Sequence, residues 1–206
     1  VFNFHTHPDH VGGNHEFERV LAIDTEYTRR HAREGFSHET MRDQVAPDAL
    51  CRPLPPATDP SSYRVEPWRI SGTIRDGQRI DLGGRTLEVL RIPGHAPDAA
   101  ALLDRERGLL FTGDTFYEGP IYLFGEATDL QAYETTVERP ARLAPSLELL
   151  LPGHNTPASA PRMLVSLEEA LAAVTRGEVE GESRPGDRVE YVFERFTLLM
   201  KAGAGG

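Results

Sequence analysis

Residues 5–10 read His5-Thr6-His7-Pro8-Asp9-His10, and this segment carries the strongest functional signal in the chain. Three histidines and one carboxylate within so short a segment form a candidate metal-binding cluster, because imidazole and carboxylate groups are common metal ligands. In an extended segment residues i and i+2 point to the same side, so His5 and His7 can bind one ion. The turn after Pro8 brings Asp9 and His10 to a neighbouring position, and the spacing therefore suggests two adjacent ions.

A surface histidine run, such as a tag, is the alternative explanation of this stretch. The apolar residues Val1, Phe2 and Phe4 precede it, and Val11-Gly12-Gly13 follow it. An apolar strand that leads into a glycine-containing turn is typical of a folded site rather than of a tag.

Length and composition indicate one soluble domain. The chain has 206 residues, of which 39% are hydrophobic and 26% charged, and no apolar run approaches membrane-spanning length. The formal net charge of -10 argues against a nucleic-acid-binding surface, which is normally basic. We therefore expect neither nucleic-acid nor membrane partners, and a cytoplasmic location unless a targeting segment was lost from the N-terminus. Cys51 is the single cysteine, so no internal disulfide is expected, and the oligomeric state is left open.

Hydrophobic periodicity and turn residues predict the order of the elements. A short helix and a strand are expected within residues 14–23, and one or two helices within 24–47. The proline-rich segment 47–67 is expected to be an irregular loop, and long loops of this kind often shape binding sites. The remaining expectations are hairpins at 79–92 and 99–112, helices at 129–144 and 164–174, strands at 147–151 and 189–200, and a disordered tail at 201–206.

Three more candidate ligands stand just after strand signals. His95 follows Ile92-Pro93-Gly94, Asp114 follows Phe111-Thr112-Gly113, and His154 follows Leu151-Pro152-Gly153. A lone histidine or aspartate in such a place is more often structural. Three of them in one chain with the first cluster favour a shared metal site, because loops gather at the ends of strands.

These motifs resemble those of the metallo-β-lactamase-fold hydrolases, in the order in which that family has them. The matching segments are His5-Thr6-His7-Pro8-Asp9-His10, Pro93-Gly94-His95, Phe111-Thr112-Gly113-Asp114-Thr115 and Leu151-Pro152-Gly153-His154. The resemblance implies an α/β fold, a four-layer αββα sandwich with a dinuclear metal site at one edge. It implies that His5, His7 and His95 hold the first ion, that Asp9, His10 and His154 hold the second, and that Asp114 bridges them.

The resemblance also exposes a departure at the start of the chain. Family members carry several strands and a helix before the first histidine motif, whereas only four residues stand there in this chain. We therefore expect residues 1–200 to form a metallo-β-lactamase-like domain that lacks most of its N-terminal sheet, as part of a longer gene product.

The expected chemistry is hydrolysis by a metal-bridging hydroxide. Two zinc ions suit the histidine-rich ligands best, although iron or manganese suits such sites too. Zinc lowers the pKa of bound water to roughly 7, so a hydroxide is available at neutral pH. Asp9 can orient the nucleophile and pass its proton to the leaving group. Tyr117 stands at the spacing after Asp114 at which lactonases of this family have a tyrosine, and it either donates to the oxyanion or packs in the core.

The substrate expected from the resemblance is a small ester, thioester or lactone. A β-lactamase is the alternative inside the enzyme class, but that branch usually has serine where this chain has Asp114. The family's nuclease and flavin-linked branches need additional domains for which this chain has no room. A non-catalytic metal-binding domain is the alternative outside the enzyme class, and its signature would be a lost ligand.

Two further groups of residues have simpler explanations. His15, His31 and His38 are expected at the surface. The cluster of Arg29, Arg30, Arg33 and Arg42 is expected to be a solvated helix face, or else a cationic patch that attracts an acidic tail of the substrate, such as a nucleotide.

Overall fold

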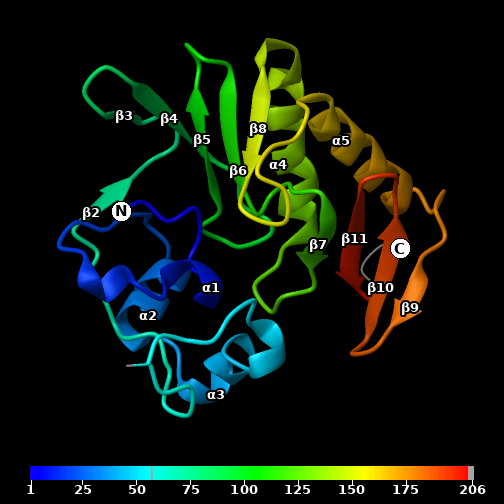
Figure 1. The fold of residues 1–206 in the computed structure, drawn as a ribbon. Helices are drawn as coiled ribbons and strands as arrows, with labels where there is room; N and C mark the ends of the chain where they lie inside the picture. Colours follow the sequence, from blue (N-terminus) through cyan, green and yellow to red (C-terminus); the bar gives the residue numbers. More distant parts are fainter. Residues whose placement is uncertain (57, 204–206) are drawn as a thin grey trace. The chain divides into compact units, whose positions relative to one another are not determined.

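The computed structural model describes residues 1–56 and 58–203 and has a mixed α/β fold, as expected (Figure 1). The chain divides into two compact units, Val1–Ile74 and Arg75–Gly206. The expected first cluster of ligands belongs to unit 1, and the three later candidates belong to unit 2.

Unit 1 is built on a small parallel sheet. Strand β1 (Leu21–Ile23) pairs with β2 (Gly72–Ile74), and an isolated bridge joins Phe2 to Leu21 on β1 in the parallel sense. The residues from Phe2 toward His5 therefore run in the same direction as β1. The helices of this unit are α1 (Pro8–Val11), α2 (Glu26–Glu34) and α3 (His38–Met41), with 3-10 turns at Asn14–Glu16, Arg42–Gln44 and Pro47–Ala49.

Helix α2 has clear start and stop signals. The Thr25 hydroxyl caps its N-terminus by accepting a hydrogen bond from the Thr28 backbone N–H at 3.0 Å. Its C-cap is Gly35, with φ of 64° and with Val65 O only 2.2 Å from where a Cβ would stand. Only glycine fits this position, because it has no Cβ and adopts positive φ without strain. One face of α2 packs on the apolar cluster of unit 1, which comprises Val11, Val20, Ala32, Met41, Val65 and Trp68.

Unit 2 contains two sheets. The five-stranded sheet has the order β3-β4-β5-β6-β8, with antiparallel pairing except between β6 and β8, which are parallel. Its strands are β3 (Arg79–Asp81), β4 (Thr86–Arg91), β5 (Ala100–Asp104), β6 (Leu109–Gly113) and β8 (Leu149–Pro152). The four-stranded sheet has the order β7-β11-β10-β9. Its strands are β7 (Gly119–Leu123), β9 (Glu182–Arg184), β10 (Arg188–Val192) and β11 (Phe196–Lys201).

Two long helices complete the core of unit 2. Helices α4 (Leu130–Leu143) and α5 (Arg162–Thr175) lie side by side, next to β8 (Figure 1). One continuous apolar cluster joins them to both sheets, with Leu110 and Leu150 from the first sheet and Leu198 from the second. This core fixes the ends of β6 and β8, after which two of the candidate ligands stand.

Most of the expected elements are confirmed. Both hairpins, both long helices and the strand near 147–151 are present, although only Leu150 of that strand is buried. The expectation of one strand over 189–200 is wrong, because the chain turns back after β10 and returns as β11 to form a hairpin. The expected disordered tail begins too early. Lys201 is the last residue of β11, Ala202 N donates to Asp187 O at 2.9 Å, and residues 204–206 lie outside the described range.

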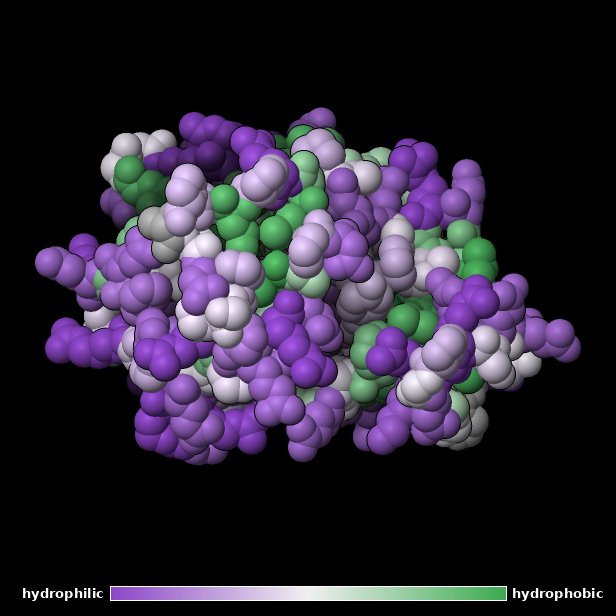
Figure 2. Space-filling view, turned by 60° about the horizontal axis from the view of Figure 1, so that its bottom comes forward, coloured by the Kyte–Doolittle hydropathy of each residue, from purple (hydrophilic) through white to green (hydrophobic). Residues whose placement is uncertain are grey.

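Hydrophilic residues cover most of the face in Figure 2, and hydrophobic residues gather there in smaller patches. Within the described residues, no helix is both long enough and apolar enough to cross a bilayer.

Candidate metal centre

The N-terminal ligand group consists of His5, His7, Asp9 and His10 in unit 1. His7 occupies the N-cap position of helix α1 in an extended conformation, with φ of -68° and ψ of 154°, and Pro8 occupies the first helical position. Proline is favoured there because its fixed φ suits a helix and its missing N–H would be unsatisfied anyway. The chain therefore changes from an extended segment to a helical turn between His7 and Asp9, as the motif predicts.

The side chains of this group lie close together. The ring centroids of His5 and His7 are 4.4 Å apart, and those of His5 and His10 are 4.3 Å apart. The Nε2 atom of His10 lies 3.3 Å from Oδ2 of Asp9. His5 is buried, whereas Asp9 is exposed and therefore accessible to a substrate.

Three residues that were not predicted to belong to the site hold this segment in place. Asn3 Nδ2 donates to His10 O at 3.0 Å, and Asn14 Nδ2 donates to Asn3 Oδ1 at 2.9 Å. His31 Nδ1 lies 2.9 Å from Thr6 O, the carbonyl between the two histidines. The expectation that His31 lies at the surface is wrong, because it occupies the buried face of α2.

The C-terminal ligand group consists of His95, Asp114 and His154 in unit 2. Asp114 directly follows β6, and His154 stands two residues after β8, which is the parallel neighbour of β6. Parallel strands end at the same edge of a sheet, so these two side chains meet there. The Nε2 atom of His154 lies 2.9 Å from Oδ2 of Asp114, and the Nε2 atom of His95 lies 3.7 Å from the same oxygen.

His95 is oriented by its second ring nitrogen. Its Nδ1 lies 2.9 Å from the backbone carbonyl of Tyr122, to which it donates when it carries the proton. The other nitrogen, Nε2, is then the one with a lone pair for a metal ion. Metal-binding histidines in proteins are usually fixed in this way.

Two glycines keep space for this group. A Cβ at Gly94 would stand 2.4 Å from Cα of Tyr133, at a φ of 140°, so only glycine fits before His95. A Cβ at Gly153 would stand 2.8 Å from Oδ1 of Asp114. The glycine before His95 is therefore required by packing against Tyr133 of helix α4, whereas a side chain at position 153 would displace the Asp114 carboxylate.

The donor set of both groups fits divalent transition metals. Five imidazoles and two carboxylates are ligands for zinc, iron and manganese, and every one of these side chains is on the described part of the chain. Two observations support this fit. The candidate ligand side chains lie close together within each unit, and Gly153 leaves room for the Asp114 carboxylate.

Tyr117 lies beside the C-terminal ligand group. Its ring stands 5.2 Å from that of His154 in an edge-on arrangement and is buried. Its hydroxyl oxygen accepts a hydrogen bond from the Tyr122 backbone N–H at 3.3 Å. Burial and this bond are what a packing role predicts.

The sequence is similar to several known hydrolases. Residues 1–154 match the family model described as the metallo-beta-lactamase superfamily. Acyl-coenzyme A thioesterase MBLAC2 from Homo sapiens is 30% identical over 152 residues, which are 73% of this chain and 53% of that protein. Hydroxyacylglutathione hydrolase GloC from Haemophilus influenzae is 26% identical over 117 residues, which are 57% of this chain and 49% of that protein. The chain thus spans about half the length of these curated relatives.

Solved structures share the fold. The metallo-beta-lactamase family protein TTHA1429 from Thermus thermophilus superposes with a TM-score of 0.62 at 24% identity, over 89% of this chain and 65% of that chain. TTHA1623 in a di-iron-bound form superposes with a TM-score of 0.53 at 23% identity, over 80% of this chain and 73% of that chain.

Proposed function

The chain belongs to the metallo-β-lactamase superfamily, and we propose that it acts as a dinuclear metal-dependent hydrolase that cleaves thioesters. In this proposal residues 1–200 form one domain, and both ligand groups contribute to one dinuclear site. His5, His7 and His95 hold the first ion, Asp9, His10 and His154 hold the second, and Asp114 binds both.

The observation that carries the proposal is the position of the Asp114 carboxylate. One oxygen, Oδ2, lies 2.9 Å from His154 Nε2 and 3.7 Å from His95 Nε2. These two histidines are assigned to different ions, so an oxygen near both is suited to bridge them. A non-catalytic domain would be expected to have lost a ligand, whereas all seven candidates are present in the sequence.

Two divalent ions bound there would supply a water of lowered pKa as nucleophile and would polarise the carbonyl of the substrate. The residues of the chain do the rest. Asp9 is exposed beside His10, so its carboxylate can orient the attacking water and carry a proton to the leaving thiolate. His95 is held by the Tyr122 carbonyl and keeps its ring orientation during the reaction.

Thioesters are favoured among the expected substrates because of the relatives. Two of them carry thioester-hydrolase names, an acyl-coenzyme A thioesterase and a hydroxyacylglutathione hydrolase. Lactones and simple esters are cleaved by the same chemistry and rank after thioesters. A β-lactamase is the second candidate, and Asp114 disfavours it because the resembling β-lactamases usually have a serine at the corresponding position. Zinc is the proposed metal; the di-iron form of TTHA1623 makes iron the second choice.

The expected small-molecule substrate and cytoplasmic location also belong to this proposal. Its test is a comparison of kcat/KM for an acyl-coenzyme A, a hydroxyacylglutathione, a lactone and a penicillin on the metal-loaded full-length protein. His7→Ala, which removes a proposed ligand, serves as the inactive control. We expect a thioester to be the best substrate. Faster turnover of the penicillin than of any thioester would overturn the proposed order.

A further inference from the structure

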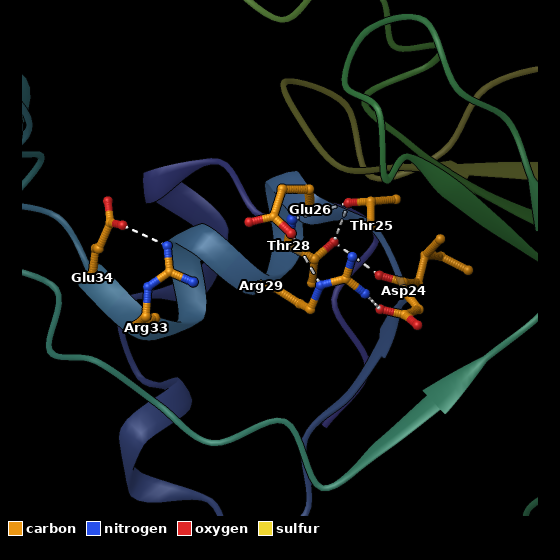
Figure 3. A network of polar contacts seen from close by, with 8 residues as sticks. Asp24, Thr25, Glu26, Thr28, Arg29, Arg33 and Glu34 are labelled. Atoms are coloured by element: carbon orange, nitrogen blue, oxygen red, sulfur yellow. Dashed lines mark hydrogen bonds and ion pairs between the residues drawn. The ribbon is translucent and has the colours of Figure 1, made fainter.

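Helix α2 and the segment after it carry four arginines, of which three are neutralised locally. Arg29 forms ion pairs with Asp24 and Glu26, and Arg33 Nη2 lies 2.8 Å from Glu34 Oε1 (Figure 3). Arg42 Nε lies 3.4 Å from Asp43 Oδ1. These three guanidinium groups are exposed and paired, so they form the solvated face that the sequence analysis expected.

Arg30 differs from the other three. It is exposed and forms no ion pair with any residue that the structure describes. Its guanidinium carbon instead lies 5.7 Å from the ring centroid of Tyr27, one turn earlier on the helix. A cation over an aromatic ring is held in a preferred orientation, while its N–H edges remain available to an anion.

Tyr27 connects Arg30 to the N-terminal ligand group. Its ring lies 6.2 Å from that of His7, and 4.0 Å from that of His31. His31 in turn contacts the carbonyl of Thr6. Arg30 therefore contacts an aromatic ring that also contacts a proposed metal ligand, and all three residues belong to the same compact unit.

We propose that Arg30 binds an anionic group of the substrate, a carboxylate or a phosphate, at a distance from the thioester bond. This inference rests on the proposed function and names the substrate class more narrowly, as an anionic thioester. The planar guanidinium matches either oxyanion with two parallel hydrogen bonds. A chain with a net charge of -10 repels such substrates, so an arginine without an ion pair among the described residues, one aromatic ring away from His7, gives them a specific point of attachment.

The test compares Arg30→Gln with Arg33→Gln, a matched control on the same helix. Each is assayed on an acyl-coenzyme A, which offers phosphates, on a hydroxyacylglutathione, which offers carboxylates, and on a neutral S-acyl-N-acetylcysteamine. For Arg30→Gln we expect KM to rise about three- to tenfold for an anionic thioester, with kcat unchanged and the neutral substrate unaffected. The anionic substrate that shows the rise identifies the group bound. Arg33→Gln should match the wild type on all three, and Arg30→Lys should lie between, because it keeps the charge without the planar fork.

An equal loss on the neutral thioester, or the same loss in Arg33→Gln, would overturn the role of Arg30. A direct binding measurement separates this result from a failure of the proposed function. Calorimetric titration of the metal-loaded protein uses desulfo-coenzyme A and S-methylglutathione, which have no free thiol to bind the metals. One outcome is that the wild type cleaves no thioester and still binds one of these anions more tightly than Arg30→Gln does. That result would support the anion site and refute the proposed reaction. Binding that is undetectable, or equal in the wild type and in Arg30→Gln, would refute the anion site.

Discussion

The Nδ1 atom of His31 lies 2.9 Å from the carbonyl oxygen of Thr6, the residue between His5 and His7. Because a carbonyl only accepts hydrogen bonds, His31 must carry its proton on Nδ1 to make this bond. Both residues are buried, with 8% and 2% of their surfaces exposed, so the bond is shielded from water. The same nitrogen lies 3.2 Å from the Thr6 hydroxyl oxygen, and in its Nδ1-protonated form His31 holds the backbone between two proposed metal ligands.

Removing this donor should weaken metal binding. His31→Phe keeps an aromatic ring against Tyr27 and Phe36 but leaves the Thr6 carbonyl without this donor. Loss of such supporting contacts typically lowers metal affinity, and we expect a loss of about tenfold. Competition with a chromophoric chelator measures the affinity, and thermal unfolding of the metal-free protein measures any general loss of stability.

His31→Gln is the matched control, since its amide can donate to the same carbonyl and should restore part of the affinity. A positioning role for His31 would be refuted if the phenylalanine variant bound metal as tightly as the wild type.

Asp114 should determine how many ions the protein retains. In Asp114→Ala the first ion would keep three histidines, whereas the second would keep only Asp9, His10 and His154. We therefore expect the metal content after dialysis to fall from about two ions per chain to about one. Elemental analysis gives the content, and Asp114→Asn shows whether the negative charge or only the oxygen is needed. Two ions retained in Asp114→Ala would exclude a bridging role.

Several features of the site follow directly from the sequence. Asp114 and His154 could be placed at one edge because each follows an apolar run, and the two runs form parallel neighbours, β6 and β8. Local signals also predicted the hairpin of β3 and β4, since a Gly83-Gly84 turn separates its two strands.

Other features depend on contacts between distant residues. His31 shows no signal of burial in its own segment, because the carbonyl that bonds to it belongs to Thr6, 25 positions earlier. Strand β7 was missed because its partner is β11, more than 70 residues later in the chain. The glycine requirement at position 153 likewise arises from Asp114, which is on another strand end.

Removal of the Tyr117 hydroxyl should lower kcat by no more than about tenfold. Removal of one oxyanion donor elsewhere costs on the order of 10²–10³ in kcat, but two metal ions would share the charge here. If Tyr117 donates to the oxyanion, Tyr117→Phe should lower kcat by roughly tenfold without changing metal content. Steady-state kinetics with elemental analysis of the same preparation tests this. An unchanged kcat would leave Tyr117 with only the packing role that its burial and its bond to Tyr122 favour.

Stability at acidic pH should depend on Asp104, at the end of β5. Its Oδ2 accepts hydrogen bonds from Arg85 Nε at 2.6 Å and from Arg107 Nη1 at 3.3 Å, and the side chain is buried. Burial raises the pKa of Asp104, but hydrogen bonds from the Arg107 backbone N–H and from the Arg85 guanidinium outweigh it. The pKa is therefore held below its ordinary value.

A carboxyl with a lowered folded-state pKa stabilises the fold above its unfolded pKa, and this stabilisation is lost as pH falls through the folded pKa. We therefore expect the melting temperature of the wild type to fall as the pH drops below about 4. In Asp104→Asn this dependence should be weaker and the stability lower at neutral pH, since two arginines lose their shared anion. Glu106→Gln, an exposed change on the same turn, should follow the wild type. Scanning calorimetry from pH 3 to pH 7 measures the melting temperature of each variant. If the melting temperatures of Asp104→Asn and the wild type change with pH in parallel, the Asp104 ion pairs do not control stability at acidic pH.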